Sequence, residues 1–263
     1  MDLGLQGKVA LVAASSRGLG RAAAMELARE GARVALCARN AEELQATAEA
    51  IRRETGAEVL AIPADLTRAE DIQRLVARVE AHFGRVDILV TNAGGPPGGS
   101  FEDFDDEAWR RAWELTFMSA VRLIRAVLPG MKARRWGRII NITSVSVKQP
   151  LPDLVLSNAY RAAVAGVAKT LANDLAPLGI TVNNVCPGWT LTDRVQELVQ
   201  RRAAQQGISF EEALQAATAS IPMRRMGRPE ELAALIAFLA SERAAYITGT
   251  TIPVDGGSVQ GLL

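Results

Sequence analysis

The stretch from Lys8 to Arg21 (KVALVAASSRGLGR) constrains the fold more than any other part of the chain. Residues 9–14 form an apolar run typical of a strand buried on both faces of a parallel sheet. Small residues follow, and from Leu19 onward the apolar residues recur at helical spacing. A strand, a tight turn and a helix start direct backbone N–H groups and the positive helix end at one point. The stretch predicts either a pyrophosphate-binding turn or a plain strand-to-helix connection.

Length and composition narrow the remaining possibilities. A chain of 263 residues suits one large α/β domain, and its 30 basic and 29 acidic residues leave no charge surplus for nucleic acid or a membrane surface. There is no N-terminal signal pattern and no apolar run of membrane-spanning length, so we expect a soluble cytoplasmic protein. Cys37 and Cys186 read as buried thiols, and the single histidine, His82, excludes a Ser-His-Asp triad and a histidine-built metal site.

Strand-like and helical patterns alternate along the whole chain, which predicts repeated βαβ units and a doubly wound parallel sheet of about seven strands. After the first unit, we expect strands over 33–38, 58–64, 86–91, 138–143, 181–186 and 251–254. We expect helices over 41–54, around 72–83, from Trp109 to an end near Pro129-Gly130, over 155–176 and around 232–239. Residues 190–220 are expected to form a substrate flap within a single domain spanning 1–263.

Ligands of such sheets bind beyond the carboxyl ends of the strands. That rule gathers the turn 15–20 with the segments that follow the later strands: Arg39-Asn40, Asp65-Leu66, Asn92-Ala93-Gly94, Ser144 and Pro187-Gly188. Arg39 follows Gly18 by 21 residues, where a nucleotide ribose would be recognised. Together with Arg17 it suits a 2′-phosphate, so NADP is favoured over NAD as cofactor, unless both arginines are ordinary surface residues.

Several motifs in sequence order resemble those of the short-chain dehydrogenase/reductase family over essentially the whole chain. They are AASSRGLG at 13–20, ADLT at 64–67, TNAG at 91–94, GRIINITSV at 137–145, LAPLGITVNNVCPG at 175–188, GRPEELA at 227–233 and YITGTTIPVDGG at 246–257. The resemblance implies a Rossmann-type α/β fold, a nicotinamide dinucleotide, and a homotetramer formed through the two long helices. It is strongest to the 3-oxoacyl-acyl-carrier-protein reductases.

The resemblance also assigns cofactor contacts. Gly18, Leu19 and Gly20 would meet the pyrophosphate. Arg17 and Arg39 are the candidates for the phosphorylated ribose, and Ala14, Ser16 and Asn40 are further cofactor-binding candidates. Asp65 and Leu66 would meet the adenine, and Asn92, Ala93 and Gly94 the adenosine ribose. The nicotinamide and phosphates would be flanked by Pro187, Gly188, Thr190 and Thr192. Ala14 stands where the family has its first glycine, and a positive φ there would cost on the order of 1 kcal/mol.

The catalytic group departs from the family's pattern of Asn, Ser, Tyr and Lys. Only Ser144 is retained; Thr116, Ser157 and Arg161 stand at the positions of the asparagine, the tyrosine and the lysine. A serine hydroxyl is a far weaker acid than the phenol that supplies the proton in the family. Arg161 keeps the positive charge and could still hold the nicotinamide ribose, but a permanently protonated guanidinium is not a conservative replacement for lysine.

Two further features leave alternatives open. Tyr160, three residues after Ser157, is either a substitute proton donor or a tyrosine packed at a helix contact. Arg134, Arg135 and Arg138 read as a solvated cluster after a helix end, or as a surface for an acidic carrier protein. We expect an NADP(H)-dependent oxidoreductase acting on a small-molecule or carrier-linked carbonyl. The alternatives are a catalytically silent nucleotide-binding homologue and a non-redox enzyme on the same scaffold.

Overall fold

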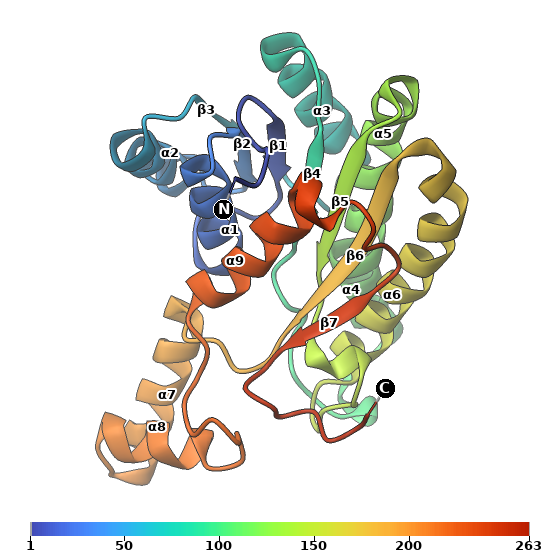
Figure 1. Ribbon diagram of the computed structural model, residues 1–263. Coiled ribbons are helices and arrows are strands. Elements are labelled where there is room, and N and C mark those ends of the chain that lie inside the picture. Colours follow the sequence, from blue (N-terminus) through green and yellow to red (C-terminus); the bar gives the residue numbers. More distant parts are fainter. Residues whose placement is uncertain (1, 263) are drawn as a thin grey trace.

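The computed structural model describes residues 2–262, and the backbone alone at positions 194, 197, 198, 201 and 202. Seven parallel strands form one sheet in the order β3-β2-β1-β4-β5-β6-β7 (Figure 1). The strands are β1 Val9–Val12, β2 Arg33–Ala38, β3 Val59–Pro63, β4 Ile88–Thr91, β5 Gly137–Ile142, β6 Ile180–Pro187 and β7 Thr251–Val254. The helices are α1 Gly18–Arg29, α2 Ala41–Thr55, α3 Ala69–Phe83, α4 Asp106–Ala112, α5 Ser119–Arg134, α6 Val155–Leu175, α7 Asp193–Gln206, α8 Phe210–Thr218 and α9 Pro229–Ala240.

The predicted doubly wound parallel sheet is confirmed, with small differences at the strand ends. β1 stops at Val12 rather than at residue 14, because Ala14 has φ +48° and cannot continue an extended strand. β6 runs from Ile180 to Pro187 and is longer at both ends than its apolar run suggested. We call the edge where the strands begin the amino edge, and the edge where they end the carboxyl edge.

The long helix predicted from Trp109 to Pro129-Gly130 is wrong in two respects. A π-helical turn, η2 Trp113–Met118, separates α4 from α5, and α5 passes through Pro129 to end at Arg134. The proline removes a single backbone donor, whereas Met131 beyond it is fully buried, so packing extends the helix. The helix ends where Arg135 adopts a left-handed conformation with φ +53°.

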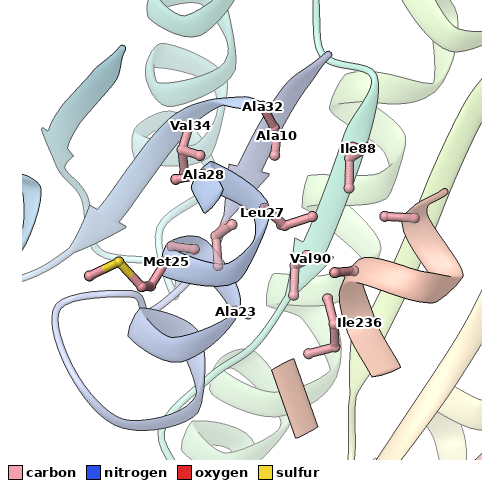
Figure 2. Packing of buried hydrophobic residues seen from close by; sticks show 14 of the residues in the cluster. Ala10, Ala23, Met25, Leu27, Ala28, Ala32, Val34, Ile88, Val90 and Ile236 are labelled. Atoms are coloured by element: carbon pink, nitrogen blue, oxygen red, sulfur yellow. The ribbon is translucent and has the colours of Figure 1, made fainter. Parts of the chain in front are cut away.

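Two hydrophobic cores lie on opposite faces of the sheet. Side chains of α1, α2 and α9 build one core, and those of α3, α5 and α6 build the other. Figure 2 shows Leu27 of α1 and Ile236 of α9 lying over Ile88 and Val90 of β4 in the first core. Because both faces are covered, β1 and β4 consist almost entirely of buried apolar residues, whereas β5 and β6 also carry buried polar side chains.

The predicted flap folds as a helical hairpin that projects from the sheet, drawn in orange in Figure 1. α7 and α8 enclose a small core of their own, which contains Val199, Ala203, Ala213 and Met226. A short parallel bridge between Thr190 and Gly227 joins the segment that enters the hairpin to the segment that leaves it. Its entry and exit are therefore pinned together next to the carboxyl edge.

A row of polar side chains crosses four neighbouring strands inside the sheet. The Thr91 hydroxyl donates to Asn141 Oδ1 (2.7 Å), Asn141 Nδ2 to Asn184 Oδ1 (2.9 Å) and Asn184 Nδ2 to Thr251 Oγ1 (3.0 Å). Each pair is also a register pair of adjacent strands, from β4 to β7. Thr91, Asn141 and Asn184 are buried, so every link satisfies a polar group that water cannot reach.

The arginines expected to form one solvated cluster do not do so. Arg138 is 2% exposed, and its guanidinium donates to the carbonyl oxygens of Gly137 (3.0 Å) and Gly179 (3.2 Å) at the amino edge. It is a buried structural cation, because strand β5 carries it inward between backbone carbonyls. Arg134 donates to the carbonyl oxygen of Val86 and Arg135 to that of Pro177.

Among residues 2–262, no helix is long and apolar enough to cross a membrane. The same residues contain no cluster of three or more His, Cys, Asp or Glu side chains suited to a metal ion.

Candidate active site

The turn after β1 has the geometry of an anion cradle. Ala14 and Gly18 both have positive φ, +48° and +57°, so the alanine adopts the strained backbone that glycine favours. A Cβ on Gly20 would lie 2.4 Å from the Ala14 carbonyl oxygen, so only glycine fits there. No side chain caps the start of α1 at Arg17, which leaves the first helical N–H groups directed at the space above the turn.

The turn lies beside the end of β2. Ser15 N donates to the Cys37 carbonyl oxygen (3.0 Å), and Cys37 N donates to Ser15 Oγ (3.1 Å). This pairing brings Ser16 and Arg17 alongside Arg39, and both arginine side chains are exposed. Asn40 uses its Oδ1 to cap α2, accepting from the backbone N–H groups of the first turn at 3.1 Å.

Two residues of α2 that contact the turn, Glu43 and Thr47, were not predicted from the sequence. The Ser16 hydroxyl donates to Glu43 Oε2 at 2.7 Å, and the Ser16 carbonyl oxygen accepts from Thr47 Oγ1 at 2.6 Å. Glu43 and Thr47 lie four residues apart on one face of α2. Nothing in the sequence signals this contact, because it depends on how α2 packs against the turn.

The ends of β3 and β4 close the adenosine side of the cradle. Asp65 Oδ1 accepts from the Thr67 N–H (3.0 Å) and hydroxyl (2.8 Å), and Leu66 is buried beside it. Partial burial favours the neutral carboxyl, but the Thr67 hydrogen bonds and the charge of Arg39 outweigh it and lower the pKa of Asp65. Asn92 Nδ2 donates to the Ala14 carbonyl oxygen (3.4 Å), which joins the start of the segment 92–94 to the same turn.

The end of β6 brings the flap against the phosphate turn. The Gly188 N–H donates to the Val254 carbonyl oxygen (3.0 Å), and a Cβ on Gly188 would lie 2.7 Å from Asp255 Cβ. Thr190 is buried and its hydroxyl donates to the Gly188 carbonyl oxygen (3.3 Å). Thr192 caps α7, and its methyl group lies 3.6 Å from the position a Gly18 Cβ would occupy. Residues 187–192 thus border the space above the turn.

Arg161 and Ser157, one helical turn apart on α6, form a hydrogen-bonded pair. Arg161 Nε donates to Ser157 Oγ at 3.2 Å, and Nη1 donates to the carbonyl oxygens of Ile142 (3.2 Å) and Thr143 (2.7 Å). The guanidinium is therefore held at the end of β5 with a fixed orientation. Because the Ser157 oxygen accepts a hydrogen bond from a permanent cation, its own O–H remains available as a polarised donor.

Ser144 follows β5 directly, next to this pair. Its side chain caps the short helix Val145–Val147 by accepting from the Ser146 N–H (3.1 Å). Cys186, on the neighbouring strand, is fully buried with Sγ 3.0 Å from the Thr143 hydroxyl. Burial raises the pKa of the Cys186 thiol and so disfavours the nucleophilic thiolate.

Thr116 lies in the π-helical turn and faces a small cavity. Its side chain is 6% exposed, and its Oγ1 has no hydrogen-bond partner within residues 2–262. Asn92, Thr143 and Arg161 line the same cavity, which has room for about one water molecule. The structure thus brings the predicted positions 116 and 161 together across the ends of β4 and β5.

Tyr160 is directed away from that cavity, into an aromatic cluster. Its hydroxyl donates to the Trp109 carbonyl oxygen (3.1 Å), and its ring packs edge-on against Trp109 (5.8 Å) and Trp113 (5.7 Å between centroids). Burial raises the pKa of the Tyr160 phenol, which makes it a weaker acid. This placement favours the packing interpretation over a role as proton donor.

The carboxyl edge therefore combines an anion cradle, two exposed arginines and a hydroxyl–guanidinium pair. The close approach at Gly20 and Gly188 and the uncapped helix start suit the pyrophosphate of a dinucleotide. The unpartnered Thr116 hydroxyl and Ser144 lie farther along the same edge, at the far end of such a ligand. Hydroxyl donors beside a fixed cation can stabilise negative charge that develops on a substrate oxygen.

Comparison with known proteins points to the same chemistry. A family described as enoyl-(acyl carrier protein) reductase matches residues 13–259. The 3-oxoacyl-[acyl-carrier-protein] reductase FabG of Pseudomonas aeruginosa is 37% identical over 255 residues, which cover 97% of this chain and 98% of that protein. Dehydrogenase/reductase SDR family member 4 of Sus scrofa is 36% identical over 259 residues, 98% and 89% of the two chains. The L-sorbose reductase of Gluconobacter frateurii, solved with NADPH and L-sorbose, superposes with a TM-score of 0.97 at 38% identity and covers 100% of both chains.

Proposed function

Because the chain belongs to the short-chain dehydrogenase/reductase family, we propose that it is an NADP(H)-dependent oxidoreductase that interconverts a ketone and a secondary alcohol. The observation that carries this proposal is the convergence of the phosphate turn, Ser144 and the Ser157–Arg161 pair on one edge of the sheet. The turn would hold the dinucleotide, and the hydroxyls and the guanidinium would lie next to its reactive end.

The cofactor assignment rests on charge and on the relatives. Arg17 and Arg39 lie exposed on both sides of the ribose end, which suits the dianionic 2′-phosphate that distinguishes NADP(H) from NAD(H). The L-sorbose reductase with the same fold was solved with NADPH. The turn residues 14–20, the segments 65–66 and 92–94, and residues 187–192 would hold the rest of the dinucleotide.

The catalytic group works without the family's tyrosine. The Ser144 and Ser157 hydroxyls donate to the carbonyl oxygen, and Arg161 strengthens the Ser157 donor through its Nε–H. The chemistry that NADPH would supply when bound is a hydride for the carbonyl carbon. The Ser157 hydroxyl would give its proton to the substrate oxygen as negative charge develops there. A water molecule would return a proton to the Ser157 oxygen and leave hydroxide in the solvent, because the guanidinium does not release a proton near neutral pH. We expect a rate about 10²- to 10⁴-fold below that of a site with a positioned phenol.

The substrate is a ketone on a small molecule or on a carrier-linked acyl chain. Relatives named for 3-oxoacyl groups and for L-sorbose span that range. Both classes present a carbonyl between carbon substituents, which a pair of hydroxyl donors can orient equally well.

A specific observation also keeps the catalytically silent homologue as a second candidate. The Arg161 guanidinium is engaged with two backbone carbonyls, and the Tyr160 hydroxyl is engaged with the Trp109 carbonyl oxygen. Both side chains can be explained by packing alone. In that case the chain would bind the dinucleotide as a sensor or as a partner subunit without reducing a ketone.

The assembly we propose is a homotetramer formed through α4–α5 and α6. On α6, Ala159, Ala162 and Gly166 are exposed, and a Cβ on Gly166 would meet only open space. Small residues at this spacing let two helices approach closely. Light scattering at micromolar concentration should give four times the mass of the chain, and a monomer mass would contradict the proposal.

Cofactor titration followed by a carbonyl panel tests the function. We expect NADPH to bind at least several-fold tighter than NADH, and Arg39→Asp to reverse that order. Arg53→Asp, an exposed arginine at the far end of α2, is the matched charge-reversal control and should leave the order unchanged. A 3-oxoacyl thioester and a ketose should then be tried at high enzyme concentration. NADPH binding without any reduction would favour the silent homologue, and no binding would reject both.

A further inference from the structure

The phosphate turn is held to α2 by two side chains of that helix. Thr47 Oγ1 donates to the Ser16 carbonyl oxygen at 2.6 Å, and the Ser16 hydroxyl donates to Glu43 Oε2 at 2.7 Å. Ser16 is 9% exposed, whereas Glu43 is half-buried with its carboxylate at the rim. The hydroxyl of the turn therefore donates its one proton to a carboxylate.

That carboxylate lies among the groups proposed to recognise the adenosine ribose. Arg17 follows Ser16, and Arg39 precedes Glu43 by four residues at the end of β2. Asp65, at the end of β3, is close enough to Arg39 for their charges to interact. The ribose end thus combines two cations with two anions, and Glu43 is the anion bonded to the turn itself.

We propose that Glu43 is a specificity-determining residue that opposes the 2′-phosphate of NADP(H) and favours the free 2′-hydroxyl of NAD(H). This inference rests on the proposed cofactor site. A phosphate placed at Ser16 and Arg17 would approach the carboxylate and lose the Ser16 hydroxyl as a donor, because like charges repel at short range. A ribose hydroxyl can instead donate to the carboxylate, as it does to acidic residues in NAD sites.

The preference therefore results from opposing contributions. The two arginines favour the phosphorylated cofactor, and Glu43 reduces the margin by which they do so. The chain should use NADPH first but still bind NADH measurably. Neutralising Glu43 removes the repulsion and releases the Ser16 hydroxyl, so the phosphorylated ligand gains on both counts.

Isothermal titration with adenosine 2′,5′-bisphosphate and 5′-AMP isolates this effect, because the two ligands differ only in the 2′-phosphate. We expect Glu43→Gln to raise the ratio of their affinities by about tenfold, equivalent to about 1.4 kcal/mol. Glu42→Gln is the matched control: it removes the same charge from the same helical turn, but Glu42 is exposed. It should change the ratio by less than about twofold, as expected of a screened surface charge.

Three results would overturn the inference. An unchanged or lower ratio in Glu43→Gln would mean that the carboxylate serves only to position Ser16. An equal rise in Glu42→Gln would mean that any charge on α2 has the same effect. A rise in Ser16→Ala as large as that in Glu43→Gln would assign the effect to the hydroxyl bond rather than to the charge. If the parent protein binds neither the bisphosphate nor NADPH, the proposed cofactor site fails and this inference with it. If only the ratio test fails, the cofactor site stands.

Discussion

The amino and carboxyl edges of the sheet both hold charged and aromatic side chains, but these side chains have different kinds of partner at the two edges. At the amino edge, the Trp136 ring lies under Lys8 Nζ (3.7 Å to the centroid) and Arg138 Cζ (4.4 Å), and Trp136 Nε1 donates to Glu242 at 3.0 Å. At the carboxyl edge, Ala14 is strained and the buried Thr116 hydroxyl has no partner within residues 2–262. The amino edge also holds a left-handed residue, Arg135, and two buried atoms without a partner within residues 2–262, Arg33 Nε and Thr181 Oγ1, but only the carboxyl edge carries the phosphate turn.

Asp87, also at the amino edge, is a buried carboxylate whose partners come from three parts of the chain. Its buried carboxylate accepts from the Val9 N–H (3.0 Å) and from Arg85 Nε (2.8 Å), and Arg134 Nε lies 3.6 Å away. The start of β1, the start of β4 and the end of α5 are thereby joined through one side chain. The comparison teaches that substitutions at the amino edge should affect stability, and those at the carboxyl edge should affect binding and chemistry.

Arg138→Ala should give the largest effect. The change leaves the carbonyl oxygens of Gly137 and Gly179 without their donor and removes one partner of Trp136, so we expect a loss of about 3 kcal/mol in the free energy of unfolding. Urea denaturation measures it. NADPH affinity of the folded variant should be unchanged, and Arg243→Ala, an exposed neighbour of Glu242, should cost little. A normal unfolding midpoint for Arg138→Ala would contradict the assignment of structure to this edge.

Restoring the family's catalytic group at the carboxyl edge should come next in size. Ser157→Tyr combined with Arg161→Lys and Thr116→Asn should raise ketone reduction by at least about 10²-fold, the scale of one positioned acid. Ser157→Tyr alone should gain less, because Arg161 remains tied to the end of β5. Tyr160→Phe in the parent should leave any residual activity unchanged; a fall of about 10²-fold would instead make Tyr160 the proton donor.

Ala14→Gly tests whether backbone strain at the carboxyl edge serves cofactor binding. Glycine adopts φ +48° without a Cβ penalty, so we expect a gain of about 1 kcal/mol in stability together with equal or tighter NADPH binding. Arg135→Gly is the corresponding change at the amino edge, where φ is +53°. It should alter the unfolding free energy and leave the NADPH dissociation constant unchanged. Loss of NADPH affinity in Ala14→Gly would mean that the strained turn is itself required.

We expect the smallest effect from the ion pair between Arg225 and Glu231 at the carboxyl edge. Glu231 accepts from both terminal nitrogens of Arg225 (2.8 and 2.7 Å), which lowers its pKa to about 2. A lowered pKa stabilises the folded state at pH values above the ordinary pKa of 4.5. This stabilisation is lost as the pH falls toward 2. Solvent screens this pair, so Glu231→Gln should cost no more than about 1 kcal/mol at neutral pH. The cost should vanish in urea titrations at about pH 2.

The order and type of most elements could be predicted from the sequence, because hydrophobic period separates buried strands from amphipathic helices. Features set by tertiary contacts could not. The π-helical turn has no signature of its own, and Pro129 misled the prediction because the buried Met131 beyond it extends α5. Arg138 resembled its solvated neighbours in sequence and differs from them only because strand β5 carries it inward.

At the candidate site, strand-end positions could be predicted and side-chain partners could not. The rule that ligands meet the carboxyl ends of parallel strands selected Ser144 and the turn without any structure. The Glu43–Ser16 bond and the seat of Arg161 on the carbonyls of Ile142 and Thr143 depend on packing between elements far apart in the chain. Motif spacing carries no information about such contacts.

The polar row from Thr91 to Thr251 has a consequence for how the chain finds its sheet. Parallel strands of similar apolar composition can pair out of alignment or in the wrong order with little loss of burial. Here a slip of one residue in β5 would place Ile140 or Ile142 opposite Asn184 and leave buried polar groups unpaired, at about 1–3 kcal/mol for each orphaned group. The row lets β4 through β7 reject incorrect neighbours during folding. The strands β1 to β3 lack these links and must rely on their turns and helices for alignment.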